Sequence, residues 1–206
     1  MRFVLILLAI VGAGPAAAQA PPGGSPVFHG ALEVLPAPGS IDRAAQGSSV
    51  LRVHRWRLIL VPPSDGSPGS NGIFPATERV DVAVGTAPDN SFFLPPGSLT
   101  SRHRGKVFTY RAPRGTARGI RTLRITRVGA ADPDGVYRTY RLNFTLTGVL
   151  LPDLLTKTQP DCMPFAVIVG DDDGFSGVQL AEPHLSGRRF TIKSSCVPGG
   201  DWPWLG

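Results

Sequence analysis

The sequence predicts an all-β fold with antiparallel strands and minimal helix. Apolar and polar residues alternate over several short stretches, most regularly from Tyr140 to Thr147, and a period of two is typical of a strand with one buried face. The chain also holds 25 Gly and 21 Pro, many of them between these stretches, where they favour turns. No stretch keeps the 3.6-residue period of an amphipathic helix over several turns. A chain of 206 residues in this class is expected to form an antiparallel β-sandwich or two related small β units.

The N-terminus has the pattern of a cleavable secretory signal peptide. Arg2 supplies a positive charge, an apolar run follows from Phe3 to Val11, and small residues occupy positions 16–18. The apolar run is too short to cross a bilayer, and no later stretch is long enough. We therefore expect a signal peptide at 1–18 and a secreted protein, periplasmic or extracellular, that does not span a membrane. Residues 19–26, rich in Pro and Gly, are expected to form a disordered lead-in.

A first β domain is predicted for residues 27–150. It opens with a strand from Val27 to Leu35, followed by a more apolar strand from Val50 to Val61. In this second strand the alternation changes phase between Val53 and Trp56. A β-bulge at His54 and Arg55 would account for the change, because one extra residue moves every later side chain to the other face.

Two stretches share one order of features, which indicates an internal repeat. Residues 79–111 and 164–193 each begin with an apolar strand that ends in Gly, at Gly85 and Gly170. An acidic loop, a Phe, a Leu and a Gly turn then lead to a second strand that contains Phe-Thr. The units differ in length only within loops, where insertions are tolerated. We expect the first unit at 79–111 and a related second unit, with a C-terminal tail, within 151–206.

Residues 120–147 are predicted to form a β-hairpin. Two alternating strands flank the sequence Asp132-Pro133-Asp134-Gly135, in which Pro presets φ and Gly accepts the positive φ that closes a tight turn. The order is therefore strand unit, hairpin, connector and strand unit. From Arg79 to Lys193 this pattern resembles secreted bacterial β-repeat domains that carry no assigned activity. The resemblance implies an exported β fold and no reaction.

The only two cysteines, Cys162 and Cys196, bracket the second unit. In an oxidising compartment they are expected to pair as a disulfide, since no His lies at the spacing of a zinc site. The bridge would close a loop of about 34 residues and stabilise the fold by roughly 3–4 kcal/mol.

Asp171, Asp172 and Asp173 precede Gly174 and form the densest acidic cluster. Carboxylate oxygens suit Ca²⁺, which is the one cofactor that the sequence suggests, although the spacing is not that of an EF-hand. The alternative is a solvated turn, in which Asp and Gly are favoured for geometry alone.

Positive charge is concentrated in the middle of the chain. The formal net charge is +6, and between Arg102 and Arg141 there are eleven Lys or Arg against two acids. Arginine binds carboxylate, sulfate or phosphate in a bidentate manner. A weak anion-binding surface is therefore predicted, which would suit an anionic polysaccharide or a lipid surface. Its candidate residues are Arg121, Arg124, Arg127, Arg138 and Arg141.

Other readings of the arginines and of the function stay open. The arginines could instead keep strand edges soluble and unpaired. Nucleic acid is not expected as a partner, because neither a recognition helix nor an aromatic RNA-binding signature is present. Hydrolase motifs such as Gly-x-Ser-x-Gly and His-Glu-x-x-His are absent, and no catalytic residue is singled out. The sequence favours a non-catalytic envelope or extracellular protein with a structural or binding role. The alternatives are an anionic glycan or lipid binder and a secreted hydrolase with a carboxylate site.

Overall fold

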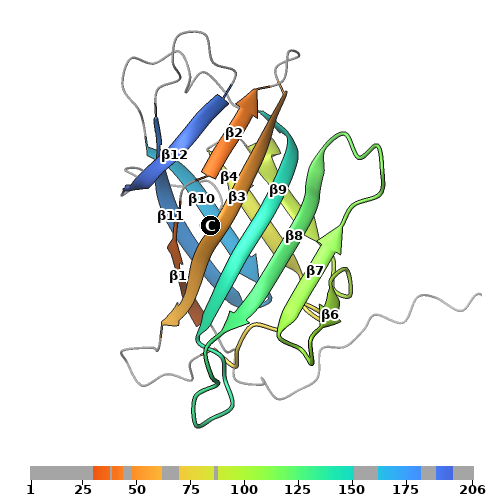
Figure 1. The fold of residues 1–206 in the computed structure, drawn as a ribbon, viewed down its shortest axis with the longest axis vertical. Coiled ribbons are helices and arrows are strands. Elements are labelled where there is room, and N and C mark those ends of the chain that lie inside the picture. The colour runs from red at the N-terminus through yellow and green to blue at the C-terminus, as the bar shows by residue number, and fades with distance from the viewer. Residues whose placement is uncertain are drawn as a thin grey trace, which may run out of the picture.

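The computed structural model describes residues 30–37, 39–43, 48–61, 70–85, 88–150, 162–181 and 189–196. These residues form one twelve-stranded β-sheet with the order β5-β4-β10-β11-β12-β2-β3-β9-β8-β7-β6, in which β1 pairs with both β11 and β3 (Figure 1). The predicted signal peptide, the lead-in and the C-terminal tail lie outside the described residues. The strands are β1 (Gly30–Leu35), β2 (Gly39–Arg43), β3 (Ser48–Val61), β4 (Val80–Val84), β5 (Ser91–Leu94), β6 (Thr100–Arg102), β7 (Val107–Arg111), β8 (Gly119–Val128), β9 (Thr139–Leu150), β10 (Cys162–Val169), β11 (Asp172–Ala181) and β12 (Arg189–Cys196).

The all-β prediction is confirmed. The one helix among the described residues is a 3₁₀ turn at Pro88–Asn90, and every strand pair except one is antiparallel. The exception is β1, which runs parallel to β11 from Gly30 to Glu33 and antiparallel to β3.

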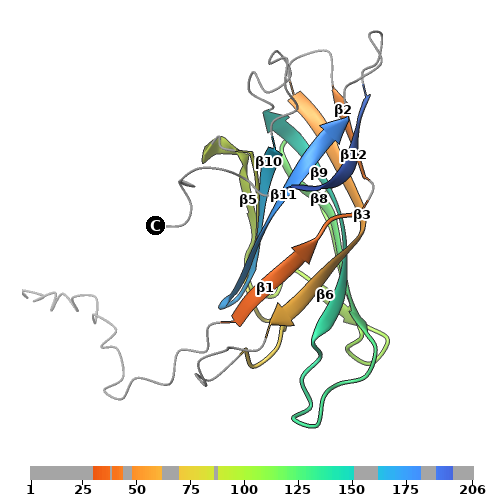
Figure 2. The same ribbon diagram turned by 90° about the vertical axis from the view of Figure 1, so that its left-hand side faces the viewer.

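The sheet folds over on itself into two layers (Figure 2). Strands β5, β4, β10 and β11 form one layer, and β3, β9, β8, β7 and β6 form the other. Strands β12 and β2 connect the layers at one end, while β1 connects β11 to β3 near the other. One sheet therefore supplies both walls of the core.

The core between the layers is centred on three aromatic rings. Trp56 from β3 and Phe144 from β9 lie with ring centroids 6.0 Å apart, and Phe165 from β10 packs edge-on against Trp56 at 4.9 Å. Such edge-to-face pairs contribute about 0.5–1.5 kcal/mol beyond the burial of their surface. The indole N–H of Trp56 donates to the carbonyl of Ala37 at 2.9 Å, so the buried ring has no unsatisfied donor.

Two local predictions are confirmed by the strand register. Strands β8 and β9 pair as an antiparallel hairpin, from Val128 opposite Thr139 to Gly119 opposite Thr147. In its turn, Asp132 accepts backbone N–H bonds from Asp134 and Val136. The pairing of β3 with β9 shifts between Val53 and Trp56, which is the predicted bulge.

The two similar units meet in the middle of one layer. Strands β4 and β10 pair directly, from Val80 opposite Val169 to Val84 opposite Phe165. Gly85, after β4, donates its N–H to the carbonyl of Pro164, and Gly170, after β10, donates to that of Arg79, both at 2.9 Å. Both glycines have positive φ, +70° and +65°, which lets the chain turn at the end of each strand. The units are thus parts of one sheet rather than two separate β units.

The register does not accommodate the predicted disulfide. Cys162 on β10 lies opposite Gln179 of β11, and Cys196 on β12 lies opposite Gly177 of the same strand. With β11 between them, the two Cα atoms are at least two strand spacings apart, about 10 Å. A disulfide requires Cα atoms within about 7 Å.

Candidate anion-binding groove

An open groove of about 580 Å³ crosses the layer formed by β6, β7, β8, β9 and β3. Its charged and amide side chains include Arg102, Arg111, Arg124, His54 and Asn143. Its hydroxyl-bearing residues are Ser98, Thr100, Thr109, Tyr110, Thr122 and Thr145. We call this feature the main groove.

Strand alternation explains why polar groups gather on the outer side of this layer. Along β9, Leu142, Phe144 and Leu146 are buried in the core. Asn143 and Thr145, which alternate with them, therefore project to the other face. Strand register then aligns one row of polar residues across the layer. Thr100 lies opposite Thr109, Thr109 opposite Arg124, and Arg124 opposite Asn143.

The strands of this layer contain several arginines and no acidic residue. Strands β3, β6, β7, β8 and β9 contain no Asp or Glu at any position. Arg102, Arg111 and Arg124 are all exposed, so their guanidinium groups can bind an anion without first giving up a buried partner. The arrangement can hold carboxylate, sulfate or phosphate groups beside neutral hydroxyls and amides.

A second, smaller groove of about 470 Å³ continues across β3. It is lined by Ala37, His54, Arg55 and Asn143, and it shares His54 and Asn143 with the main groove. The β-bulge creates this continuation, because His54 and Arg55 are consecutive residues and both are exposed.

Arg55 at this bulge has a left-handed backbone. Its φ is +60°, and for a residue other than Gly this conformation costs on the order of 1 kcal/mol. Its N–H donates to Oδ1 of Asn143 at 2.9 Å, which fixes the bulge to β9.

The structure places only one of the five predicted arginines in a groove. Arg124 lies in the main groove; Arg121 and Arg141 are exposed but line neither groove. Arg138 forms an ion pair with Asp132, in which Nε and Oδ2 lie 2.7 Å apart, so it stabilises the hairpin turn.

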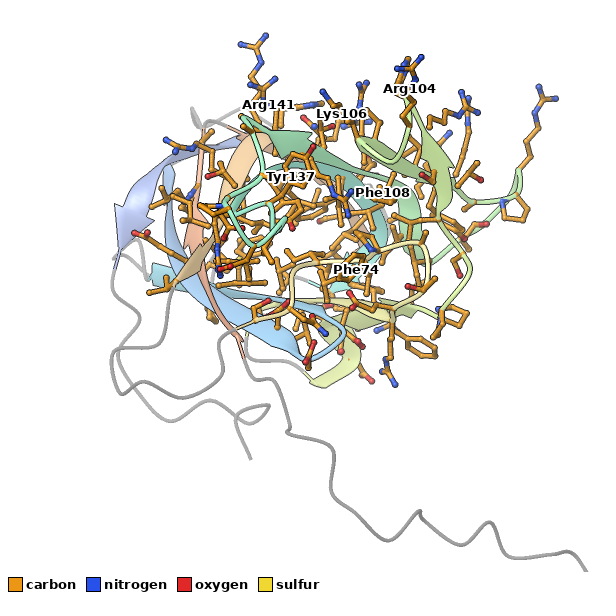
Figure 3. The ribbon with its side chains drawn as sticks, turned by 90° about the horizontal axis from the view of Figure 1, so that it is seen from below. Phe74, Arg104, Lys106, Phe108, Tyr137 and Arg141 are labelled. Atoms are coloured by element: carbon orange, nitrogen blue, oxygen red, sulfur yellow. The ribbon has the colours of Figure 1, made fainter. Side chains whose placement is uncertain are left out.

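Arg127 was also predicted to bind anions, but it points to the inner side of the layer. Its guanidinium carbon lies 4.9 Å from the ring centroid of Tyr137, 5.2 Å from Phe108 and 5.7 Å from Phe74. Figure 3 shows these three aromatic residues on the inner side, whereas Arg104, Lys106 and Arg141 project from the outer side. Arg127 therefore holds the end of the sandwich together through cation–π contacts.

Sequence reasoning missed His54, Arg55, Arg111 and Asn143 as groove residues. They lie on three strands, β3, β7 and β9, and only the pairing of these strands on either side of β8 brings them together. The available signals were the bulge itself and the absence of acids from these strands.

A separate polar cluster lies near the start of β11. Glu78 accepts the N–H of Phe74 at 2.8 Å, and a Cβ added to Gly170 would lie 2.7 Å from its carboxyl carbon. Burial is the main cause that raises the pKa of Glu78 to about 7; the bond from Phe74 opposes this shift, and the charges of Asp171 and Asp172 add to it.

Tyr140 contributes a second shifted group to this region. Its hydroxyl oxygen accepts the N–H of Ile73 at 3.1 Å, and burial is the main cause of its raised pKa. Neither Glu78 nor Tyr140 lines the two grooves, and none of the described residues lining them is a carboxylate. This placement does not favour a hydrolase that uses a carboxylate site in either groove.

The Ca²⁺ site predicted at Asp171, Asp172 and Asp173 stays a prediction. Within the described residues, no group of three or more His, Cys, Asp or Glu is placed to hold a metal ion. Asp171 lies in the turn after β10 and is half-buried, whereas Asp172 is fully buried at the start of β11.

Comparisons with known proteins give no family for this chain: no protein-family model, no curated protein and no solved structure matches it. Within the described part of the chain, no helix has the length and apolar character needed to cross a bilayer.

Proposed function

We propose that this is a non-catalytic binding protein of the cell envelope or extracellular space whose main groove holds an anionic glycan. The observation that carries the proposal is the composition of the groove. Three exposed arginines, Arg102, Arg111 and Arg124, stand among hydroxyl and amide groups on five strands that contain no carboxylate. The predicted signal peptide supports an exported location, where acidic polysaccharides occur.

The neutral groups favour a glycan over a lipid surface. Thr and Asn side chains can donate hydrogen bonds to sugar hydroxyls and accept hydrogen bonds from them. Binding to a lipid surface is instead favoured by exposed apolar side chains. The large hydrophobic residues exposed among the described residues line neither groove. They are Val61, Phe74, Phe93 and Leu150.

Binding of the protein to polygalacturonate across a salt series tests the proposal. We expect saturable binding that weakens as salt is added, because the contacts are largely between exposed charges. Arg124→Ala should weaken it about tenfold or more, since a hydrogen bond to a charged group contributes about 1.5–3 kcal/mol and about 1.4 kcal/mol is tenfold.

Arg114→Ala is the matched control, because Arg114 is exposed and lines neither groove. Both variants should keep the melting temperature of the parent protein. Absence of binding at low salt, or equal losses in the two variants, would overturn the proposal.

A further inference from the structure

The two grooves together extend across several strands of the sheet. The main groove includes residues from all five strands in the order β6, β7, β8, β9 and β3. Four strand spacings separate β6 from β3, which gives a path of about 19 Å. The smaller groove then extends the path beyond β3 to Ala37, after the end of β1.

The row of polar residues follows this path rather than the strands. It begins at Thr100, passes through Thr109, Arg124 and Asn143, and ends at the bulge that presents Arg55. Each strand thus offers a polar group to a ligand that lies across it, and the two arginines of the row, Arg124 and Arg55, are separated by the neutral Asn143. A single small anion would engage one arginine and leave the rest of the path unused.

On these grounds we infer that the ligand is an extended, linear acidic oligosaccharide that lies across the strands and ends on Arg55. This inference rests on the proposed function and adds to it the direction of the chain, a minimum length and a positioning role for the bulge. The strained backbone of Arg55 supports that role, because a residue other than Gly held in a left-handed conformation is a feature that clusters at binding sites.

Arg55 contributes at one end of the path only, so its effect depends on ligand length. An oligomer that covers the distance from Arg102 to Arg55 contacts both ends. A shorter oligomer held by Arg102, Arg111 and Arg124 does not reach the bulge. The structure therefore predicts a coupling between chain length and the residue at position 55, which simple charge attraction would not produce.

Calorimetric titration of the full chain with oligogalacturonates of increasing length, from the monomer upward, tests this. We expect affinity to rise with length until the oligomer reaches about 19 Å and then to level off. Arg55→Asn should weaken the longest oligomers about tenfold and leave the shortest unchanged, because Asn tolerates the left-handed backbone but lacks the guanidinium group. Arg57→Gln is the matched control, since Arg57 is exposed on the same strand but lines neither groove.

The outcomes separate the two proposals. Equal affinity for the monomer and the longer oligomers, with sensitivity to Arg124→Ala retained, would overturn the extended ligand but leave the proposed function standing. An Arg55→Asn effect of the same size at every length would overturn the end-of-path role of Arg55. No binding at any length would overturn both proposals. Binding to phosphatidylglycerol vesicles but to none of the oligomers would replace the glycan with a lipid surface.

Discussion

Glu78→Gln is expected to make the protein more stable at alkaline pH and to leave its stability unchanged in acid. Burial, with Asp171 and Asp172 nearby, raises the pKa of Glu78 to about 7. The folded protein therefore prefers the neutral carboxylic acid. Glutamine is always neutral, has nearly the same shape and can still accept the N–H of Phe74.

The sign and size of the effect follow from proton linkage. Below the ordinary pKa of 4.5, both the folded and the unfolded chain hold the proton. As pH rises from 4.5 to about 7, the unfolded chain releases its proton while the folded chain keeps it, so the free energy of unfolding falls across this window. The full shift corresponds to roughly 3 kcal/mol, and partial exposure of Glu78 to solvent reduces this to about 1–2 kcal/mol.

Urea unfolding at about pH 4 and about pH 8, followed by circular dichroism, measures the difference. The variant should match the parent protein at the lower pH and exceed it by about 1–2 kcal/mol at the higher pH. Glu33→Gln, which removes an exposed carboxylate from β1, is the control and should not change the pH dependence. A Glu78→Gln advantage of equal size at both pH values would show that the effect does not come from proton release by Glu78 and would refute the reasoning.

Three further substitutions and one thiol titration test separate parts of the structure. Trp56→Ala should lower the free energy of unfolding by about 3–5 kcal/mol in the same urea assay, because it empties the space between the two layers; a loss below about 1 kcal/mol would contradict the central packing. Arg127→Met should lower the free energy of unfolding by about 1–2 kcal/mol, because the cation–π contacts are lost, and should leave polygalacturonate binding unchanged. Weaker binding with unchanged stability would instead show that Arg127 binds the anion. Asp132→Ala should speed hydrogen exchange at the Val136 amide, which the carboxylate now holds at 2.7 Å; unchanged exchange would argue against this turn. Thiol titration of the denatured, unreduced protein should find Cys162 and Cys196 both reactive, and no reactive thiol would mean that the register around β11 differs from the one described.

Features governed by neighbouring residues could be predicted from the sequence. The hairpin of β8 and β9 follows from alternation on both sides of Asp132, and the bulge follows from the phase change before Trp56. The inward position of Arg127 could also be predicted from the sequence. Arg127 lies two residues after Ile125 and four after Leu123, so it shares the strand face of these two buried residues. Grouping the arginines by their place in the sequence hid this signal.

Features that depend on distant pairing could not be predicted. Nothing in Gly39–Arg43 distinguishes β2 from a loop, and its strand character comes from its neighbours β3 and β12. The relative placement of the two cysteines could not be predicted either, since spacing along the chain does not reveal that β11 lies between them. The groove likewise needs β3 beside β9, a contact between segments about ninety residues apart, as in the bond from Arg55 to Asn143.

The place of β10, β11 and β12 in the sheet has a consequence for how the chain reaches its native state. These last described strands fill the space between β4 on one side and β2 on the other. Until they are synthesised, β4 and β2 have open edges, and the aromatic cluster lacks Phe165. Pairings between distant segments form slowly, because each must first close a long loop. The chain therefore cannot complete the described fold until β10, β11 and β12 have been made.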